Sequence, residues 1–493
     1  MSIEHSRSLL LAANASGLDE QTLKKRQENA LTTLRLDAAL LGARLTARVL
    51  LTTLRRLPGK LALDCAGLSD DLVTELVDAV ERIDSTRPLT VIDGPAVGAT
   101  VQLDIGVTGE VGFVRIVPDG YGAQVANDPS VEVSLGQPAN PLGCVFAAAC
   151  GAAEAFKRIV VTKDERKTDH GHYRFCPVTL MGDTTAAPPL PSLMPLDLAL
   201  VGNGAIGTAI GLILAELRAG GRVVLCDPEL YGPENRGTYS LGGEHEGTGQ
   251  LRKVDVVGDI LEASGYTVVR VPKASTEMIQ RIDDGKLDPP RIVLAGLDNI
   301  EARRETQLLW ADHILDGATS DTNVGFVHAR PGGPCLRCLF PEPEAGPDPL
   351  LRLAHKTGLP LSRLKRGQDA LSEEDIASLA PEQQELLRRH VGRPVCGLAD
   401  ALGLTDIDSD GYLPSVPFVS QMAACLVVGR LLALRLGVST KANFCQFDAL
   451  HGPKFAEPET RNPEPVCRCQ THPHVVESVR SHRWGNLSTP PRA

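Results

Sequence analysis

The second part of the sequence predicts an α/β fold with a mostly parallel sheet and helices on both of its faces. Three observations support this prediction. Short apolar runs alternate with helix-length segments over residues 196–316, a glycine-rich turn joins the first run to the first helix, and a proline-rich segment at 186–195 precedes them. Regular alternation of this kind is typical of parallel sheets. With 493 residues the chain is long enough for a second, smaller α/β domain in front of this one.

Residues 1–190 are expected to form the smaller domain, which combines helices with an α/β unit. Residues 20–56 are rich in Leu, Ala and Arg at helical spacing, and they predict one long amphipathic helix that is broken near Gly42. Ser69 can cap a helix that runs to about Ile83. Short β-like runs follow at 89–92, 101–105, 112–117 and 131–135, and a helix rich in small residues follows at 142–157.

Residues 195–475 are expected to form the larger domain. The predicted strands are 196–202, 222–227, 267–271, 291–295 and 313–316, and the predicted helices are 206–219, 251–264, 276–283 and 300–312. Residues 341–412 are polar, contain prolines and interrupt the alternation, so they predict a crossover segment or insertion. Residues 476–493 are expected to be a loosely ordered tail.

Composition and charge exclude several classes of protein. The formal net charge is -11 and no long Lys/Arg block occurs, so no nucleic-acid partner is expected. The most apolar stretch, 418–438, contains Gln421, Arg430 and Arg435, which favours a packed helix over a membrane span. Twelve cysteines without a charged-then-apolar leader are typical of a reducing compartment. We therefore expect a cytoplasmic protein.

A glycine-rich turn predicts a phosphate site. Gly202, Gly204 and Gly207 form a GxGxxG pattern directly between a predicted strand and a predicted helix. The glycines allow a tight turn and a close approach of phosphate, and the helix N-terminus offers its N–H groups. Asp227 ends the next strand, where a carboxylate can accept a hydrogen bond from a ribose hydroxyl. This is a Rossmann-like pattern, and on the glycines alone an NAD- or FAD-binding unit is the better interpretation.

Further polar residues follow in a fixed order. They are Glu229, Asn235, Arg236, Lys253, Asp298 and Asn299. Activation of a carboxylate by ATP brings two anions together, so it requires cations, neutral donors and an acid that holds Mg²⁺. Arg236 and Lys253 can supply the positive charge, Asn235 the donor, and Asp298 the metal ligand.

This ordered set resembles the ThiF/MoeB/HesA-type adenylyltransferase superfamily, which includes the ubiquitin-activating enzymes. In that family an acid-x-acid strand end, matched here by Asp227 and Glu229, leads to an Asn, an Arg, a Lys and a later Asp. The resemblance covers residues 195–470. It implies that ATP adenylates the C-terminal carboxylate of a ubiquitin-like or sulfur-carrier protein that ends in Gly, with Mg²⁺ as cofactor.

The sequence departs from the family pattern at two positions. The family places its arginine three residues after the Asn, and Thr238 occupies that position here. Glu229 replaces the more common Asp. Many relatives also take an arginine from a partner subunit or lobe, and the sequence alone does not identify it here.

Two cysteine pairs predict a metal site. Cys335 and Cys338 form a CxxC pair, and Cys467 and Cys469 form a CxC pair. Four thiolates on two short turns suit tetrahedral Zn²⁺. A CxxC pair alone would also suit redox chemistry, and because CxC is tighter than CxxC, His472 is an alternative ligand. The resembled family carries such a zinc site.

Cys396 is a candidate nucleophile. Four basic residues precede it closely and favour the thiolate: Arg388, Arg389, His390 and Arg393. In family members that form a thioester, the acceptor cysteine lies on a crossover loop before an apolar helix, and residues 414–434 match such a helix. The alternative is a half-buried structural cysteine.

Several alternatives remain open from sequence. The N-terminal half has no GxGxxG motif, so it is either a degenerate adenylation-like lobe that makes the chain a pseudo-dimer, or an unrelated docking domain. A homodimer and a conjugating enzyme are further expected partners. Competing functions are an adenylyltransferase that modifies a peptide without a covalent step, an NAD-dependent oxidoreductase and a non-catalytic scaffold. The oxidoreductase hypothesis leaves Asn235, Lys253 and Asp298 unexplained. The scaffold hypothesis remains an alternative because Thr238 occupies the position of the family arginine.

Overall fold

The computed structural model describes residues 3, 5–161, 171–183, 187–341, 349–364, 369–388, 390–392, 395, 398 and 416–485. The chain divides into two compact units. The first comprises Met1–Leu297, Glu301–Leu339 and Pro414–Ala493, and the second comprises Asp298–Ile300 and Phe340–Leu413.

A seven-stranded sheet forms the N-terminal part of the first unit, in the order β3-β2-β1-β4-β5-β6-β7. The strands from β3 to β5 pair in parallel, and β6 and β7 are antiparallel. The strands are β1 (Leu31–Leu36), β2 (Lys60–Asp64), β3 (Thr90–Ile92), β4 (Val101–Ile105), β5 (Phe113–Asp119), β6 (Gly122–Ala126) and β7 (His172–Phe175). The helices are α1 (Ser6–Ser16), α2 (Glu20–Asn29), α3 (Ala43–Arg55), α4 (Asp70–Ile83) and α5 (Pro141–Val160). We call this part the N-terminal lobe.

The long helix expected over residues 20–56 is wrong, because β1 interrupts it. Central strands of a parallel sheet are buried on both faces and show no polar alternation. Thr32, Thr33 and Leu34 of β1 are all buried in this way between β2 and β4, so the run LTTLRL has no strand-like pattern. The strand expected at 131–135 is also absent from the described residues, and the antiparallel β6 lies nearer the chain start instead.

The helix predicted to start after Ser69 is confirmed as α4. The Ser69 hydroxyl accepts a hydrogen bond from the backbone N–H of Leu72, and the helix ends at Ile83. Asp70 and Asp71 lie in the first turn, where negative charge stabilises a helix N-terminus.

An eight-stranded sheet forms the rest of the first unit, in the order β10-β9-β8-β11-β12-β13-β14-β15. The strands are β8 (Leu196–Val201), β9 (Gly221–Cys226), β10 (Tyr266–Val271), β11 (Ile292–Ala295), β12 (His313–Ser320), β13 (Asn323–Ala329), β14 (Phe444–Asp448) and β15 (Glu457–Glu459). The helices are α6 (Ala205–Leu217), α7 (Lys253–Ala263), α8 (Ser275–Asp283), α9 (Ile300–Thr306), α10 (Leu336–Leu339), α16 (Pro417–Arg435), α17 (Arg468–Thr471) and α18 (Pro473–Trp484). This part is the C-terminal lobe.

The expected fold class is confirmed. The five predicted parallel strands are β8 to β12, and helices alternate with them as the sequence indicates. The antiparallel strands β13, β14 and β15 extend the sheet beyond the predicted part.

The two sheets have the same strand order. Strands β1 to β7 follow one another across the first sheet as β8 to β14 do across the second, and in both sheets the last two of these strands are antiparallel. The helices α3, α4 and α5 connect strands of the first sheet that correspond to the strands connected by α6, α7 and α16 in the second sheet. The turn after β1 has no glycine pattern, because residues 37–42 read DAALLG.

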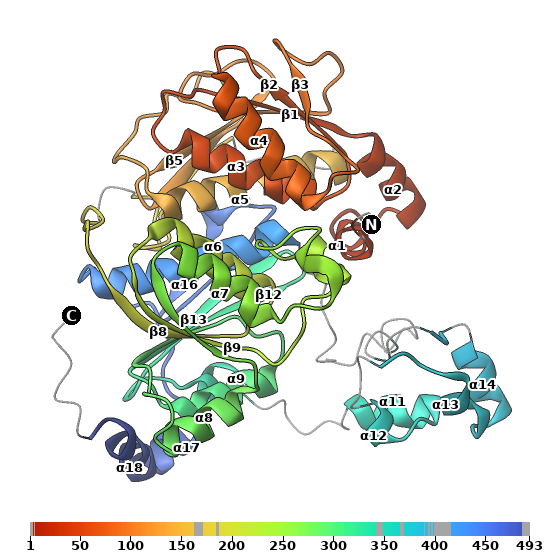
Figure 1. The fold of residues 1–493 in the computed structure, drawn as a ribbon, viewed down its shortest axis with the longest axis vertical. Coiled ribbons are helices and arrows are strands. Elements are labelled where there is room, and N and C mark those ends of the chain that lie inside the picture. Colours follow the sequence, from red (N-terminus) through yellow and green to blue (C-terminus); the bar gives the residue numbers. More distant parts are fainter. Residues whose placement is uncertain are drawn as a thin grey trace. The chain divides into compact units, whose positions relative to one another are not determined.

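Helices α5 and α16 pack against each other between the two sheets (Figure 1). Phe156 of α5 and Phe418 of α16 pack against each other with ring centroids 5.4 Å apart and an interplanar angle of 51°. By length and composition α16 is apolar enough to cross a membrane, yet 94% of that stretch is buried inside the protein. It therefore serves here as a core helix shared by both lobes.

The second unit has an apolar core of its own. Its helices are α11 (Pro349–Thr357), α12 (Leu361–Leu364), α13 (Glu373–Ala377) and α14 (Pro381–Arg388). Arg363 donates two hydrogen bonds to the carboxylate of Asp375, at 2.8 and 2.9 Å. The core residues are Leu353, Leu359, Leu364, Leu371, Ile376, Leu387, Val395 and Leu398.

The expectation of a loose tail from residue 476 is wrong for its first part. Residues 473–484 form α18, and its arginines bind the C-terminal lobe. Arg480 donates to the carboxylate of Asp312 at 2.6 Å, and Arg483 donates to the carboxylate of Asp283 at 2.7 Å.

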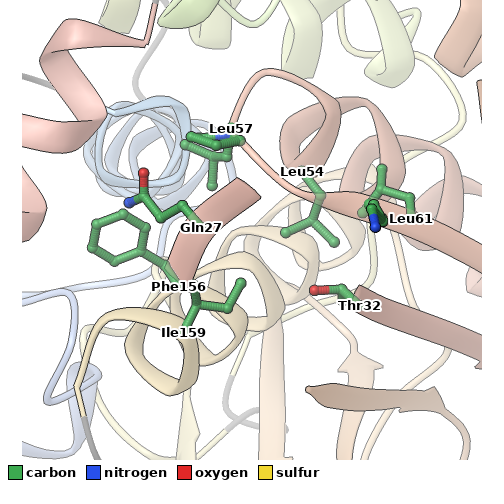
Figure 2. Close-up of a pocket in the computed structure, with 9 residues that line it drawn as sticks. Gln27, Thr32, Leu54, Leu57, Leu61, Phe156 and Ile159 are labelled. Atoms are coloured by element: carbon green, nitrogen blue, oxygen red, sulfur yellow. The ribbon is translucent and has the colours of Figure 1, made fainter. Parts of the chain in front are cut away.

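A cavity of about 10 Å³ lies in the core of the N-terminal lobe (Figure 2). Gln27 of α2 lines it together with Leu57 and Phe156. Only 2% of Gln27 is exposed, and among the described residues neither its amide oxygen nor its amide nitrogen has a hydrogen-bond partner. The residues that line the cavity belong to the N-terminal lobe, whereas the glycine-rich turn belongs to the C-terminal lobe.

Candidate functional site

The glycine turn lies between β8 and α6 and is shaped by close backbone contacts. Gly202 has a φ of +81°, and a Cβ there would lie 2.7 Å from the carbonyl oxygen of Gly296. A Cβ on Gly207 would lie 2.0 Å from the carbonyl oxygen of Gly202. Neither position can hold a side chain. The N-cap of α6 is Gly204, which has no side chain to cap the helix, and this leaves the backbone N–H groups of the first turn available to an anion.

Asp227 follows β9 and holds the glycine turn in place. One carboxylate oxygen accepts a 2.6 Å hydrogen bond from the backbone N–H of Asn203, and the other accepts a 2.9 Å bond from the N–H of Glu229. Burial raises the pKa of Asp227, while the charge of Lys253 lowers it. Each oxygen keeps a second lone pair, which can accept a hydrogen bond from a ribose hydroxyl. That bond stays a prediction.

Lys253 is the first residue of α7 and carries a buried positive charge beside the turn. Its ammonium group pairs with the carboxylate of Glu229 and lies 5.2 Å from the ring centroid of Tyr239. Burial lowers the pKa of Lys253, but Tyr239, Asp227 and Glu229 together raise it above its ordinary value. Lys253 is therefore charged at neutral pH.

Asn235 lies in a short 3-10 turn, η1 (Pro233–Gly237), and is 5% exposed. Its amide oxygen accepts a 2.8 Å hydrogen bond from the backbone N–H of Gly232. This bond fixes the orientation of the side chain through its oxygen. The N–H donors of the Asn235 amide take no part in it.

Arg236 contacts the N-terminal lobe. Its guanidinium donates a 2.9 Å hydrogen bond to the carbonyl of Ile83 in the N-terminal lobe and lies 3.4 Å from the carboxylate of Glu244. Adjacent residues of a tight turn point in different directions, so its neighbour Asn235 does not predict its orientation. The bond to Ile83 anchors the turn to the N-terminal lobe, and a role of Arg236 at the phosphates stays a prediction.

Arg7 of α1 reaches the position at which the family arginine is missing. Its Nη1 donates a 3.3 Å hydrogen bond to the hydroxyl of Thr238. The two residues are 231 positions apart, so no sequence pattern connects them, and sequence reasoning missed Arg7. A cation from the N-terminal lobe thus lies beside the turn that follows Asn235.

A second arginine of the N-terminal lobe holds the same turn from behind. Arg56, which is 1% exposed, donates hydrogen bonds to the carbonyls of Arg236 at 2.7 Å and Gly242 at 2.6 Å. A longer bond of 3.4 Å reaches the carbonyl of Ser240. The segment 236–242 is therefore fastened to the N-terminal lobe.

Asp298 and Asn299 follow β11, three and four residues after its last residue, Ala295. The side chain of Asp298 is exposed and accepts a 3.1 Å hydrogen bond from the amide of Asn299. An exposed carboxylate at the end of a parallel strand suits a Mg²⁺ ligand, and that role stays a prediction.

The four predicted cysteine ligands come together. The Sγ atoms of Cys335 and Cys338 are 3.7 Å apart, Cys335 and Cys467 are 3.6 Å apart, and Cys338 and Cys469 are 3.5 Å apart. A tetrahedron with Zn–S bonds of about 2.3 Å has edges of about 3.8 Å. The four Sγ atoms, all within 4.8 Å of one another, therefore fit a metal ion.

The alternative ligand His472 is not a member of this cluster. Its Nδ1 lies 2.8 Å from the hydroxyl of Thr471. The candidate nucleophile Cys396, and its neighbours Arg389 and Arg393, lie outside the described residues. His390 is buried in the second unit.

No curated protein matches the chain. The solved structure of MccB from E. coli with MccA has 13% sequence identity, covers 74% of this chain and 99% of its own, and gives a TM-score of 0.38. MccB from E. coli with ATP has the same identity and coverage and a TM-score of 0.34. PaaA has 14% identity, covers 51% of this chain and 60% of its own, and gives a TM-score of 0.29. At these TM-scores the likenesses support no argument about this chain.

The sequence match to a protein family is extensive. The family model of the ThiF family matches residues 190–469. This range contains the glycine turn, Asp227, Asn235, Lys253, Asp298 and all four clustered cysteines. Since the match spans more than half of the sequence, the chain belongs to the ThiF family.

Proposed function

We propose that the protein uses ATP to adenylate the C-terminal carboxylate of a peptide or carrier protein. The observation that carries this proposal is the convergence of the glycine turn, Asp227 and Lys253 at the carboxyl ends of β8 and β9. In parallel α/β sheets this edge is where nucleotides bind. Membership of the ThiF family, whose members are adenylyltransferases, supports the same activity.

The reaction forms one bond and breaks another at the α-phosphorus. A carboxylate oxygen of the substrate attacks that phosphorus, and the bond to the β-phosphate oxygen breaks, so the products are an acyl-adenylate and pyrophosphate. Both reactants are anions, and positive charge must offset their repulsion. Lys253 supplies one buried charge, and the half-buried Arg7 supplies a second charge beside Thr238. Mg²⁺ held by Asp298 would neutralise the leaving pyrophosphate.

The substrate is proposed to be a ubiquitin-like or sulfur-carrier protein, with a second step at Cys396. In that step the thiolate attacks the acyl carbon, AMP leaves, and a thioester forms. The basic residues that precede Cys396 in sequence support this role. Absence of the step would leave an adenylyltransferase that modifies a peptide directly.

The N-terminal lobe is proposed to be a degenerate copy of the adenylation lobe. Its sheet repeats the strand order of the C-terminal lobe, but the turn after β1 lacks the glycines that a phosphate needs. One chain then contains the paired lobes that a homodimer would otherwise supply, and Arg7 reaches the site from the degenerate lobe. Light scattering during gel filtration should show that active protein is a monomer.

Two measurements test the activity. ATP–pyrophosphate exchange with candidate carrier proteins should depend on Asp298, and Asp298→Asn should abolish it. Non-reducing gels should then show a thiol-sensitive adduct that Cys396→Ala removes and Cys65→Ala, at a half-buried cysteine of the N-terminal lobe, retains. Exchange without an adduct would support the direct peptide modification, and a wild-type protein that binds no nucleotide would refute the proposal.

A further inference from the structure

Tyr239 lies over the open side of the glycine turn. It directly follows Thr238 in sequence, and its backbone N–H donates a 2.9 Å hydrogen bond to the carbonyl of Asn235. A Cβ built on Gly204 would lie 3.5 Å from the Tyr239 hydroxyl oxygen. Gly204 is the second glycine of the pattern, the position at which a phosphate approaches the backbone. The tyrosine hydroxyl therefore borders the space that the phosphate would occupy.

The surroundings hold the Tyr239 ring in a fixed orientation. The ring packs edge-on against Tyr231, with centroids 5.4 Å apart and an interplanar angle of 85°. Two helices of the C-terminal lobe hold the next residue, Ser240: its N–H donates to the Thr208 hydroxyl of α6 at 3.1 Å, and its hydroxyl accepts from the Gln421 amide of α16 at 3.2 Å. A preorganised group loses little entropy when a ligand binds.

The chemistry of this hydroxyl favours a role as a hydrogen-bond donor. Tyr239 is 5% exposed, and burial raises its pKa to about 12, so it is protonated at neutral pH. The ammonium group of Lys253 is its neighbour and lies 5.2 Å from the ring centroid. A protonated phenol can donate its hydrogen to an acceptor such as a phosphate oxygen.

We propose that the Tyr239 hydroxyl donates a hydrogen bond to the α-phosphate of the bound nucleotide. The ribose is expected at Asp227, at the end of β9, so the phosphate over Gly204 is the one attached to the ribose. With Arg7, this donor compensates for the arginine that the family places at 238 and that Thr238 replaces here. The inference rests on the proposed function, because it takes an adenine nucleotide as the ligand.

Calorimetric titration with AMP, adenosine and ATP tests the proposal without a protein substrate. Tyr239→Phe should bind AMP and ATP at least about tenfold more weakly than the wild type, because a hydrogen bond to a charged group is lost. Its affinity for adenosine should be unchanged. Tyr266→Phe is the matched control: its hydroxyl donates to the carbonyl of Leu214 at 2.8 Å, near the end of α6 that is far from the glycine turn, so it should not distinguish AMP from adenosine.

Three results would overturn the inference. Unchanged AMP binding by Tyr239→Phe would show that the hydroxyl does not contact the phosphate, and tighter binding would show that it occupies the place of the phosphate. An equal loss for AMP and adenosine would show that only the packing of the ring matters. A wild-type protein that binds neither AMP nor ATP would instead overturn the proposed function itself, and the two failures are therefore distinguishable.

Discussion

Replacement of Arg56 tests whether the N-terminal lobe holds the nucleotide turn. Arg56 is fully buried and makes two short hydrogen bonds, at 2.6 and 2.7 Å, to carbonyls of the segment 236–242. A hydrogen bond from a charged donor contributes about 1.5–3 kcal/mol. Loss of both bonds costs about 3–6 kcal/mol, and relief of the burial cost of the charge reduces that sum. We expect Arg56→Met to lower the free energy of unfolding by about 3 kcal/mol.

The measurement is urea denaturation followed by circular dichroism, with two comparison variants. Arg48→Met removes an ion pair on α3, the helix that Arg56 directly follows, but Arg48 and its partner Glu216 are partly exposed, so it should cost at most about 1 kcal/mol. Arg56→Lys keeps the charge but not the fork of donors, and it should fall between the two. If Arg56→Met and Arg48→Met destabilise the protein equally, the assignment of Arg56 as the anchor of the turn is wrong.

Three further predictions address separate parts of the protein. Elemental analysis of purified protein should find one zinc per chain, which Cys335→Ser removes and Cys445→Ser, at a buried cysteine outside the cluster, retains; zinc content equal in both variants would contradict the site. Lys253→Ala should lower the rate of ATP–pyrophosphate exchange by about 10²–10³-fold, because a charge at the phosphates is lost, whereas the exposed Lys286→Ala should leave it unchanged. Gln27→Met should raise the free energy of unfolding by about 1 kcal/mol, because it removes an unpaired buried amide; no change in urea denaturation would indicate that a buried water already pairs with Gln27.

Local signals predicted the parts of the fold that they determine. Ser69 and the two acidic residues after it specify the start of α4, and the glycine spacing specifies the turn between β8 and α6. The cysteine spacing predicted a cluster whose members are more than a hundred residues apart. In the first two cases the residues determine the backbone conformation of their immediate neighbours. In the third, all four residues are thiol ligands suited to the same metal ion.

Features that depend on contacts between parts of the chain distant in sequence could not be predicted in this way. The strand β1 lies between β2 and β4 in the sheet, and Thr32, Thr33 and Leu34 are all buried, so the polar alternation that identifies a strand is missing. Arg236 turns toward Ile83 because the N-terminal lobe lies there, and Arg7 reaches Thr238 for the same reason. Such orientations depend on a partner surface, which the sequence of the turn does not contain.

The packing of α5 against α16 has a consequence for any attempt to divide the protein. A fragment that starts near residue 190 would contain every residue of the ThiF family match, but it would expose the side of α16 that α5 covers. Phe418, completely buried in the full chain, would lose its partner Phe156. Two such fragments would have the same apolar face to cover, and a symmetric pair of fragments would bury both. Removal of the N-terminal lobe should therefore yield a dimer in place of a free C-terminal lobe.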